Sequence, residues 1–292
     1  MPCALCGAAD APALGEENGY RVRRCRCGLI FVSPQPSAQD LTLFYAQYFP
    51  EESGELWGEM MRRNFDADAA YVDAHASRGL ALDIGAGHGH FLARLKSRGW
   101  RVRGLDLSPD AAAAAKRLYG IDVETRMFGP GAVPEGAFEA VTAWYVLEHV
   151  KDPAGFLAEA ARALKPGGLL GVRVPNMVFS NVFLWARAVP GLSRLLWTLG
   201  VDTDGKSSHF NLLDPPAHLY GYTPATLEGL LRKAGLEPLV TMPAKPVDVG
   251  SAGTRIAKDL AFGVTGLFYR LSGGAWNPAP AITAFARKPL KA

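Results

Sequence analysis

Three glycines on alternate positions, directly after a short apolar run, constrain this chain more than any other feature. The stretch reads LALDIGAGHGHFL from Leu80 to Leu92 and contains Gly85, Gly87 and Gly89. An apolar run, a glycine cluster and renewed apolar periodicity predict a buried strand, a tight turn and a helix start. Glycine permits positive φ and close approach of a ligand, and the first helical N–H groups bind anions. The stretch therefore predicts a glycine turn that binds a nucleotide-like ligand. The alternative is a glycine turn that serves only the packing of the strand against the helix.

The spacing of these glycines separates two kinds of cofactor site. The dinucleotide-binding fingerprint needs a glycine three residues after its second glycine, and His90 occupies that position. What remains is DxGxGxG, which resembles motif I of the class I S-adenosylmethionine (SAM) dependent methyltransferases. The resemblance implies that helix N–H groups beyond the turn bind the methionine carboxylate of SAM. It also implies a set of cofactor residues: Asp83, Gly85, Ala86 and Gly87.

A carboxylate at the end of the next predicted strand belongs to the same site. Asp106 lies near the end of the strand predicted over 100–107, 19 positions after Gly87. Ligands of open parallel sheets lie beyond the carboxyl ends of the strands, so we expect Asp106 to accept both ribose hydroxyls of an adenosine. Ser108 is the better cap for the following helix, which leaves Asp106 free for the ligand.

Apolar side chains are predicted around the adenine ring of the cofactor. Leu107 follows Asp106 directly, and Met127 and Phe128 lie at the end of a third strand predicted over 121–127. A polar residue often occupies this neighbourhood in the methyltransferase family. Here we expect an apolar sandwich instead.

Two further segments resemble the same family. The segment LEHVKDP follows a strand predicted over 138–145, and LKPGG turns into a strand predicted over 169–174. The resemblance places Ala143, Trp144 and Tyr145 at the methionine and sulfonium side of the cofactor. Glu148 and His149 would face the acceptor.

The resemblance also implies the fold class. Strands are predicted over 236–242 and 281–287 in addition to those above. The expected fold is α/β, a Rossmann-like, seven-stranded, mostly parallel sheet with an antiparallel terminal hairpin and a small N-terminal zinc-ribbon-like module.

Three histidines are candidates for a general base. His218 lies in PPAHLYGYTP, which resembles a segment of the same methyltransferase group, and His149 and His209 follow it in preference. A histidine with a near-neutral pKa can remove a proton from a hydroxyl or a carbon acid as the methyl group arrives. For each of them, a histidine that bonds the backbone and holds a loop is the alternative.

All four cysteines lie in the first 27 residues, as Cys3-x-x-Cys6 and Cys25-x-Cys27. Two close pairs can provide four thiolates for a tetrahedral, structural Zn²⁺ without an open position for chemistry. Four unlinked thiols are the alternative, and the CxC pair tightens the usual knuckle. Together with CGLIFVSPQPS, the cysteines are similar to the head of a bacterial methyltransferase group with a zinc-binding module.

These features predict five parts within 292 residues. They are a zinc-ribbon-like module at 1–36, a helical linker and cap at 37–77, a SAM-binding core at 78–175, a lid insertion at 176–222, and the remainder of the methyltransferase domain at 223–292 with a helical insertion at 243–279. A hydrophobic content of 49% suffices for one large core.

The net charge and the lengths of the apolar runs limit the kinds of binding partner and the expected location of the protein. A net charge of +3 without an arginine-rich run disfavours nucleic acid. The first residues show no signal peptide, and the apolar runs are shorter than a spanning helix, so we expect a cytoplasmic protein. A helix predicted over 259–271 is apolar enough for a membrane-surface contact, although buried packing or a homodimer contact is the more ordinary interpretation.

The resulting hypothesis is a SAM-dependent methyltransferase that methylates oxygen or carbon of a small-molecule or sugar/glycan-type acceptor. An NAD(P)-dependent reductase is one alternative, although the chain lacks GxGxxG spacing and a YxxxK pair with a matching serine. A non-catalytic SAM-binding scaffold with a zinc module is another.

Overall fold

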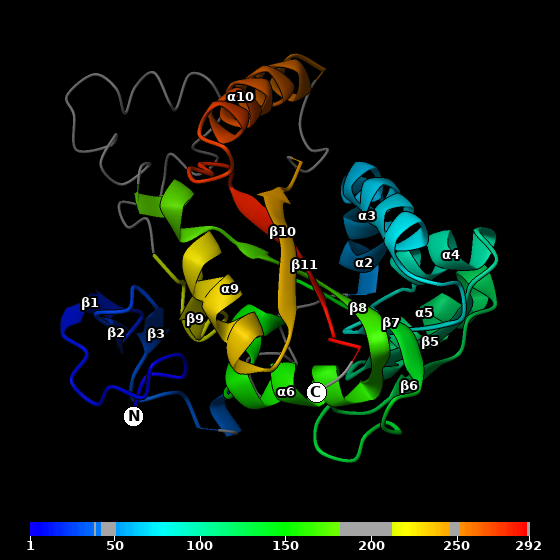
Figure 1. Cartoon of the computed structure of the whole chain (residues 1–292), viewed down its shortest axis with the longest axis horizontal. Coiled ribbons are helices and arrows are strands. Elements are labelled where there is room, and N and C mark those ends of the chain that lie inside the picture. The colour runs from blue at the N-terminus through cyan, green and yellow to red at the C-terminus, as the bar shows by residue number, and fades with distance from the viewer. Residues whose placement is uncertain (38, 42–50, 182–211, 246–251, 291–292) are drawn as a thin grey trace.

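A seven-stranded sheet runs through the centre of the protein (Figure 1). The computed structural model describes residues 1–37, 39–41, 51–181, 212–245 and 252–290, without the side chains of residues 51–55, 254 and 257. The strand order is β10-β11-β8-β7-β4-β5-β6. Their bounds are β4 (Leu80–Ile84), β5 (Arg101–Asp106), β6 (Val123–Thr125), β7 (Phe138–Trp144), β8 (Leu164–Pro175), β10 (Glu237–Pro243) and β11 (Ala281–Arg287).

The direction of the strands confirms the predicted fold class. Strands β4 to β8 pair in parallel, whereas β11 is antiparallel to both β8 and β10. Consecutive residues of β8 face opposite sides, so that Leu169 and Leu170 belong to different hydrophobic clusters. Both faces are therefore buried, which explains why these strands read as almost continuous apolar runs.

Helices cover each face of the sheet. Phe65 of α3 (Arg62–His75) and Phe91 of α4 (His90–Ser97) pack on one face, and Phe156 of α6 (Pro153–Ala163) and Leu230 of α9 (Pro224–Lys233) pack on the other. Other helical elements of the described residues include α2 (Glu51–Met60), α5 (Pro109–Tyr119), the 3₁₀ turn η1 (Leu147–His149) and α10 (Ala252–Leu271).

Three helices begin with the same two-residue pattern, a capping residue followed by proline. Ser108, Asp152 and Thr223 accept a hydrogen bond from a backbone N–H of the first turn of α5, α6 and α9. Proline suits the first helical position because its fixed φ fits the helix and its missing N–H would be unpaired there. The predicted cap at Ser108 is confirmed.

Two expected elements differ in the structure. Strand β6 covers only Val123–Thr125 because it lies at the sheet edge and pairs only with the end of β5, so Met127 lies beyond it. The LKPGG segment is not a turn ahead of a strand: β8 begins at Leu164 and includes it, with an irregular register opposite Phe138 and Ala140.

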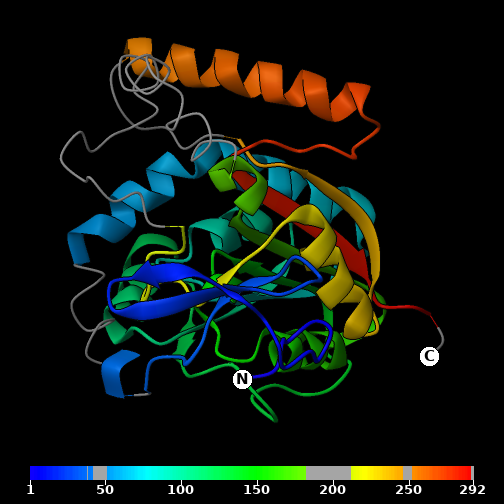
Figure 2. The same ribbon diagram turned by 90° about the vertical axis from the view of Figure 1, so that its left-hand side faces the viewer.

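A second sheet of four strands lies beside α9 (Figures 1 and 2), and the N-terminal cysteines lie in the loops that flank its strands. It is formed by β1 (Ala13–Glu17), β2 (Tyr20–Arg24), β3 (Ile30–Val32) and β9 (Tyr220–Gly221). The last strand is distant in sequence and pairs antiparallel with β3. The N-terminal segment is therefore held by the chain that follows β8, as well as by its own hairpin.

The long helix α10 lies apart from the two sheets (Figure 2). It extends further toward the N-terminus than the predicted 259–271, and several of its large apolar side chains are exposed: Ile256, Leu260, Val264, Leu267, Phe268 and Leu271. The prediction that this apolar face is buried within the chain is therefore wrong, because these side chains are exposed and none of the described residues of α10 is buried. A membrane or dimer contact stays a prediction. Within the described residues no helix is both long and apolar enough to span a bilayer.

Candidate functional site

The glycine turn between β4 and α4 has the backbone that its sequence predicts. Gly85, Gly87 and Gly89 have φ angles of 70°, 50° and 74°, in the region that side chains rarely adopt. A Cβ at Gly85 would lie 2.5 Å from Val146 Cγ2, whereas a Cβ at Gly87 would meet nothing within 4 Å. Gly85 thus serves packing against the segment after β7. Gly87 leaves open space above the turn.

Asp106 joins the glycine turn to the end of β5. Its Oδ2 accepts a hydrogen bond of 2.7 Å from the Gly87 N–H, and its Oδ1 accepts one of 2.9 Å from the Ser108 N–H. The expectation that Asp106 is free was therefore wrong, since both oxygens have a backbone donor. The Gly87 N–H is likewise used within the protein. Each carboxylate oxygen still has a second lone pair for a ligand hydroxyl.

Two exposed apolar side chains lie at the ends of the neighbouring strands β5 and β6. Leu107 is 61% exposed and Met127 is 70% exposed, and the Arg126 N–H donates to Asp106 O and so brings the two chain segments together. Ala86 is buried in the turn. Phe128 points elsewhere: it is half-buried against Phe156, with 5.1 Å between the ring centroids.

The three residues expected beside the sulfonium have different environments. The Ala143 and Trp144 side chains are buried, and Trp144 packs on Phe91 with its ring 5.3 Å from the Arg173 guanidinium carbon. Only their backbone could face a cofactor at this place. Tyr145 has φ of 57° and lies next to Trp57 of α2, with 5.6 Å between the rings. Positive φ in a tyrosine is strained and is often found at functional sites.

Asp83 lies beneath the turn, in the sheet itself. Its side chain is buried and its Oδ1 accepts a 2.7 Å hydrogen bond from Thr142 Oγ1. Burial raises the pKa of Asp83 to about 8, against the lowering effect of that bond. The carboxyl group is therefore poised to be neutral near pH 7. Sequence reasoning did not identify Thr142, because a threonine in a strand gives no signal of its own.

Glu148, His149 and His218 form a cluster beyond the carboxyl end of β7. Their ligand atoms lie within 4.8 Å of one another, and the two imidazole centroids are 5.0 Å apart. The structure thus brings together three of the four predicted acceptor-side residues, although His149 and His218 are 69 positions apart along the chain. His209 lies outside the described residues.

Backbone carbonyls orient both histidines of the cluster. His149 Nδ1 lies 2.7 Å from Ala217 O, and His218 Nδ1 lies 2.8 Å from Leu213 O. The alternative of a backbone-bonded histidine is therefore correct for one nitrogen of each ring. Burial lowers the pKa of His149 to about 4, and it also lowers the pKa of His218.

The Glu148 carboxylate is buried without a partner. Its side chain is 1% exposed, and neither oxygen has a hydrogen-bond donor among the described residues. Burial raises its pKa to about 8. Hydrogen bonds to the backbone carbonyls of η1 hold the Glu148 residue in place. The Leu219 N–H donates to Glu148 O at 2.7 Å, and Tyr222 Oη donates to Leu147 O at 3.0 Å. The segment leading into β9 therefore fixes the cluster, which no local pattern predicts.

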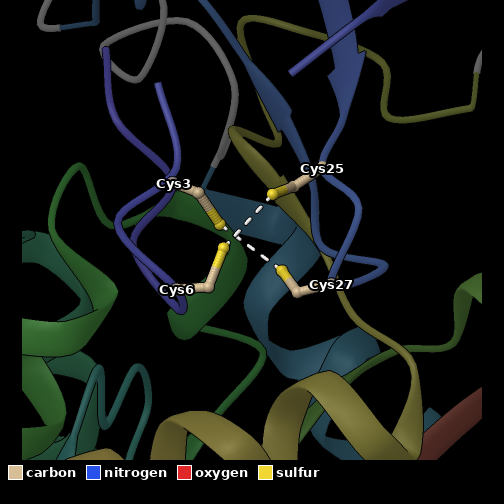
Figure 3. Close-up of side chains that lie close together, drawn as sticks. All are labelled: Cys3, Cys6, Cys25 and Cys27. Carbon is tan, nitrogen blue, oxygen red and sulfur yellow. Dashed lines mark hydrogen bonds between the residues drawn. The ribbon is translucent and has the colours of Figure 1, made fainter. Parts of the chain in front are cut away.

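The four cysteine sulfurs converge on one point in the N-terminal sheet (Figure 3). Cys3 Sγ lies 3.6 Å from Cys27 Sγ, and Cys6 Sγ lies 3.4 Å from Cys25 Sγ. Thiolates in a tetrahedral zinc site with bonds of about 2.3 Å lie about 3.8 Å apart. The residues fit a structural Zn²⁺, which would be held by one knuckle from the N-terminal loop and one from the turn between β2 and β3.

Comparisons with known proteins agree with this architecture. A ubiquinone biosynthesis O-methyltransferase of Hydrogenovibrio crunogenus is 29% identical over 162 residues, covering 53% of this chain and 61% of that protein. Its counterpart in Burkholderia vietnamiensis is 36% identical over 106 residues, covering 34% and 46%. The chain thus matches about half to three-fifths of these relatives. The one from Ralstonia nicotianae is 28% identical over 221 residues, covering 68% and 85%.

Solved structures share the fold at low sequence identity. The 1,6-didemethyltoxoflavin-N1-methyltransferase of Burkholderia thailandensis, solved with bound 1,6-didemethyltoxoflavin and S-adenosylhomocysteine, is 16% identical with a TM-score of 0.52, and the match covers 96% of this chain and 100% of that one. A SAM-dependent methyltransferase of Mesorhizobium loti is 18% identical with a TM-score of 0.50, covering 76% and 96%. The family of methyltransferase domains matches residues 56–241, which is more than half of the chain. The protein therefore belongs to the methyltransferase domain family and has the Rossmann-like fold of the class I enzymes.

Proposed function

We propose that this protein transfers the methyl group of SAM to a hydroxyl oxygen of a small-molecule acceptor. The observation that carries the proposal is the pairing of Asp106 with the open glycine turn, within 2.7 Å of the Gly87 N–H, in a methyltransferase domain. The curated relatives named as O-methyltransferases favour oxygen as the acceptor atom. Sugars and glycans are one group of hydroxyl acceptors within this class.

The adenosine of SAM would lie across the ends of β4, β5 and β6. Asp106 has lone pairs for the ribose hydroxyls, and the exposed side chains of Leu107 and Met127 offer apolar surface to the adenine. Backbone groups of Ala143 and Trp144, together with Tyr145, would border the methionine and the sulfonium. Asp83 would support the turn from below through Thr142.

The acceptor would lie on the side of Glu148, His149 and His218. In-line transfer needs an oxygen about 3 Å from the methyl carbon, a route for its proton and exclusion of water. Both histidines are neutral at pH 7 because burial lowers their pKa values, and a backbone carbonyl orients each ring through Nδ1. The predicted lid at 176–222 lies partly outside the described residues, at 182–211.

The cysteine cluster has a structural part in the proposal. Zn²⁺ bound by Cys3, Cys6, Cys25 and Cys27 would hold the N-terminal sheet together and would have no open coordination position. The methyl transfer therefore does not depend on this metal directly.

Calorimetry with SAM tests the cofactor half of the proposal. We expect the parent protein to bind SAM and Asp106→Ala to bind it at least tenfold more weakly. Asp110→Ala is the matched control, because Asp110 lies in the first turn of α5, close in sequence but on the exposed helix surface. Absence of SAM binding by the parent protein would refute the proposal, and binding of NADH in its place would favour a reductase.

Release of S-adenosylhomocysteine tests the acceptor half. A panel of small phenols, nucleotide sugars and hydroxy acids is incubated with SAM and the parent protein. Turnover that needs a free hydroxyl supports O-methylation. Turnover only on carbon or nitrogen acceptors contradicts it, and SAM binding without turnover on any member favours a non-catalytic scaffold.

A further inference from the structure

The cluster of Glu148, His149 and His218 has the donor set of a metal site. One carboxylate and two imidazoles place their ligand atoms within 4.8 Å of one another. Two of the residues come from η1 and the third from the segment before β9, so the tertiary structure assembles the set. The cysteine cluster is a separate group of four residues in the N-terminal sheet.

The hydrogen bonds of the two histidines determine which ring nitrogen carries the proton. A carbonyl oxygen can only accept, so Nδ1 of His149 must carry its proton toward Ala217 O, and Nδ1 of His218 must do so toward Leu213 O. Neutral rings bonded in this way have an unprotonated Nε2. An Nδ1–H bonded to a carbonyl is the usual outer-shell arrangement of a histidine that ligates a metal through Nε2.

The carboxylate provides an independent observation. Glu148 is 99% buried, with 1% of its side chain exposed, and both of its oxygens have no partner among the described residues. Ionisation of a buried carboxyl group without partners is costly, and a bound cation is one of the few groups that offset that cost. No arginine or lysine in the described part of the chain forms an ion pair with Glu148.

We propose that Glu148, His149 and His218 bind one divalent first-row metal ion, such as Zn²⁺, and that the metal ligates the acceptor hydroxyl. Two nitrogens and one oxygen suit such an ion better than Mg²⁺ or Ca²⁺. Three protein ligands leave a coordination position open for another oxygen, as in catalytic zinc sites. Donors at bond lengths of about 2.0–2.1 Å lie about 3.3 Å apart, so binding draws the three groups together.

This inference rests on the proposed function and names its acceptor chemistry. A bound metal would lower the pKa of a ligated hydroxyl, so the acceptor would release its proton to water as it binds, before water is excluded, and the histidines would act as ligands rather than as bases. The acceptor oxygen then forms the bond to the methyl carbon while the carbon–sulfur bond breaks. The electron pair of that bond stays on sulfur and yields S-adenosylhomocysteine.

Titration of the metal-free protein with Co²⁺ tests the site and separates it from the cysteine cluster. Cobalt bound to thiolates has an intense charge-transfer band, whereas cobalt bound only by nitrogen and oxygen has ligand-field bands alone. We expect two equivalents in the parent protein, one of each kind. Glu148→Gln and His218→Ala should each lose the equivalent without thiolate character, and Cys27→Ser should lose the other.

His75→Ala is the matched control for the histidine variants. His75 Nδ1 also lies 2.8 Å from a backbone carbonyl, that of Tyr71, but it has no place in the cluster. This variant should keep both equivalents. Retention of the thiolate band in Glu148→Gln and His218→Ala shows that these variants are folded.

Two results would overturn the inference. One is a single equivalent of Co²⁺ with thiolate character in the parent protein, and the other is a second equivalent that survives both Glu148→Gln and His218→Ala. Calorimetry with SAM on the same samples keeps the two proposals distinguishable. SAM binding without the second equivalent refutes the metal site alone, and the second equivalent without SAM binding refutes the proposed function alone.

Discussion

Gly87 has two properties that a single substitution can separate. Its φ of 50° requires a residue without a Cβ, and the space above it is open for at least 4 Å. Gly136 also has positive φ, 59°, and open space, but it precedes β7 at the opposite end of the strands. An added methyl group should therefore strain the backbone equally at Gly87 and Gly136. Only Gly87 lies at the proposed cofactor site.

Separate alanine substitutions at Gly87 and Gly136 should distinguish the effect of backbone strain from the effect of lost contact with the cofactor. Gly87→Ala and Gly136→Ala should each lower the free energy of unfolding by about 1–2 kcal/mol, because both force a side chain into the left-handed region. Only Gly87→Ala should weaken SAM binding, by about tenfold or more, as its methyl group occupies the space of the cofactor. Urea unfolding and calorimetry measure the two effects. Equal affinities of the two variants for SAM would contradict this placement of the cofactor.

Asp83 links stability to pH at a single residue. Burial raises its pKa from 3.8 to about 8, so the folded state holds a proton that the unfolded state releases between these values. The stability from this group is complete below pH 3.8 and declines as pH rises to about 8, by up to about 1.4 kcal/mol per pH unit. The groups that face Asp83 are Thr142, which donates to it, and Asp106, whose charge raises the pKa further.

Asp83→Asn should remove this pH dependence. Asparagine keeps an acceptor for Thr142 Oγ1 and has no charge to bury. The free energy of unfolding of the variant, measured in urea at pH 5, 7 and 9, should exceed that of the parent by an amount that grows with pH. The parent serves as its own control at pH 5. A difference that stays constant across this range would show that Asp83 does not titrate as described.

Among the structural elements, β8 and α3 are joined by a buried ion pair. Arg173 of β8 lies 2.8 Å from Asp68 of α3, and both side chains are at least 95% buried. Arg173 Nε also donates to Thr283 Oγ1 of β11 at 3.0 Å. The pair therefore fixes the position of α3 over the centre of the sheet.

Removal of one member of this ion pair should lower the free energy of unfolding more than replacement of both members by apolar residues. Asp68→Ala leaves the Arg173 charge buried, so we expect a loss of about 3–5 kcal/mol in the free energy of unfolding. Asp68→Leu combined with Arg173→Met replaces both charges by apolar groups and should recover most of that loss. Urea unfolding of the parent and the two variants gives the comparison. A double variant as unstable as Asp68→Ala would contradict it.

Several elements were predictable because their signals are local. The Ser108-Pro109 pair marks the start of α5, and the alternating AITAFAR segment became β11. Strand β9 was not predictable, because two residues have no periodicity of their own. Their strand conformation depends on pairing with β3, which lies about 190 positions earlier in the chain.

At the scale of the whole molecule, contacts with distant residues hold the N-terminal segment in place. Lys233 Nζ of α9 donates to Ala4 O at 2.6 Å, and β3 pairs with β9. All four cysteines of the chain lie in the cluster, so any reaction of thiols reports on this site alone. Loss of a structural metal should therefore release the sheet as a unit.

Chelation should expose the cluster. With Zn²⁺ bound we expect no reactive thiols in a thiol-titration assay, and a strong chelator should expose four per chain. Trypsin should then cleave after Arg21, Arg23 and Arg24 of β2, which pairing protects in the folded sheet. Restoring Zn²⁺ after removal of the chelator should reverse both changes. Four reactive thiols in the protein purified without chelator would contradict a bound metal.

The sequence by itself determined the order of the strands along the chain, the glycine turn and the presence of Asp106 at the end of β5. These depend on periodicity, caps and the conformational freedom of glycine, which act within a few residues. It also identified His218, His149 and Glu148 as acceptor-side residues, but not their arrangement. Only the tertiary structure decided that Glu148 is buried without a hydrogen-bond partner among the described residues and that carbonyls of Ala217 and Leu213 orient the two histidines. Burial and long-range hydrogen bonds depend on contacts between distant segments, and no local pattern encodes them.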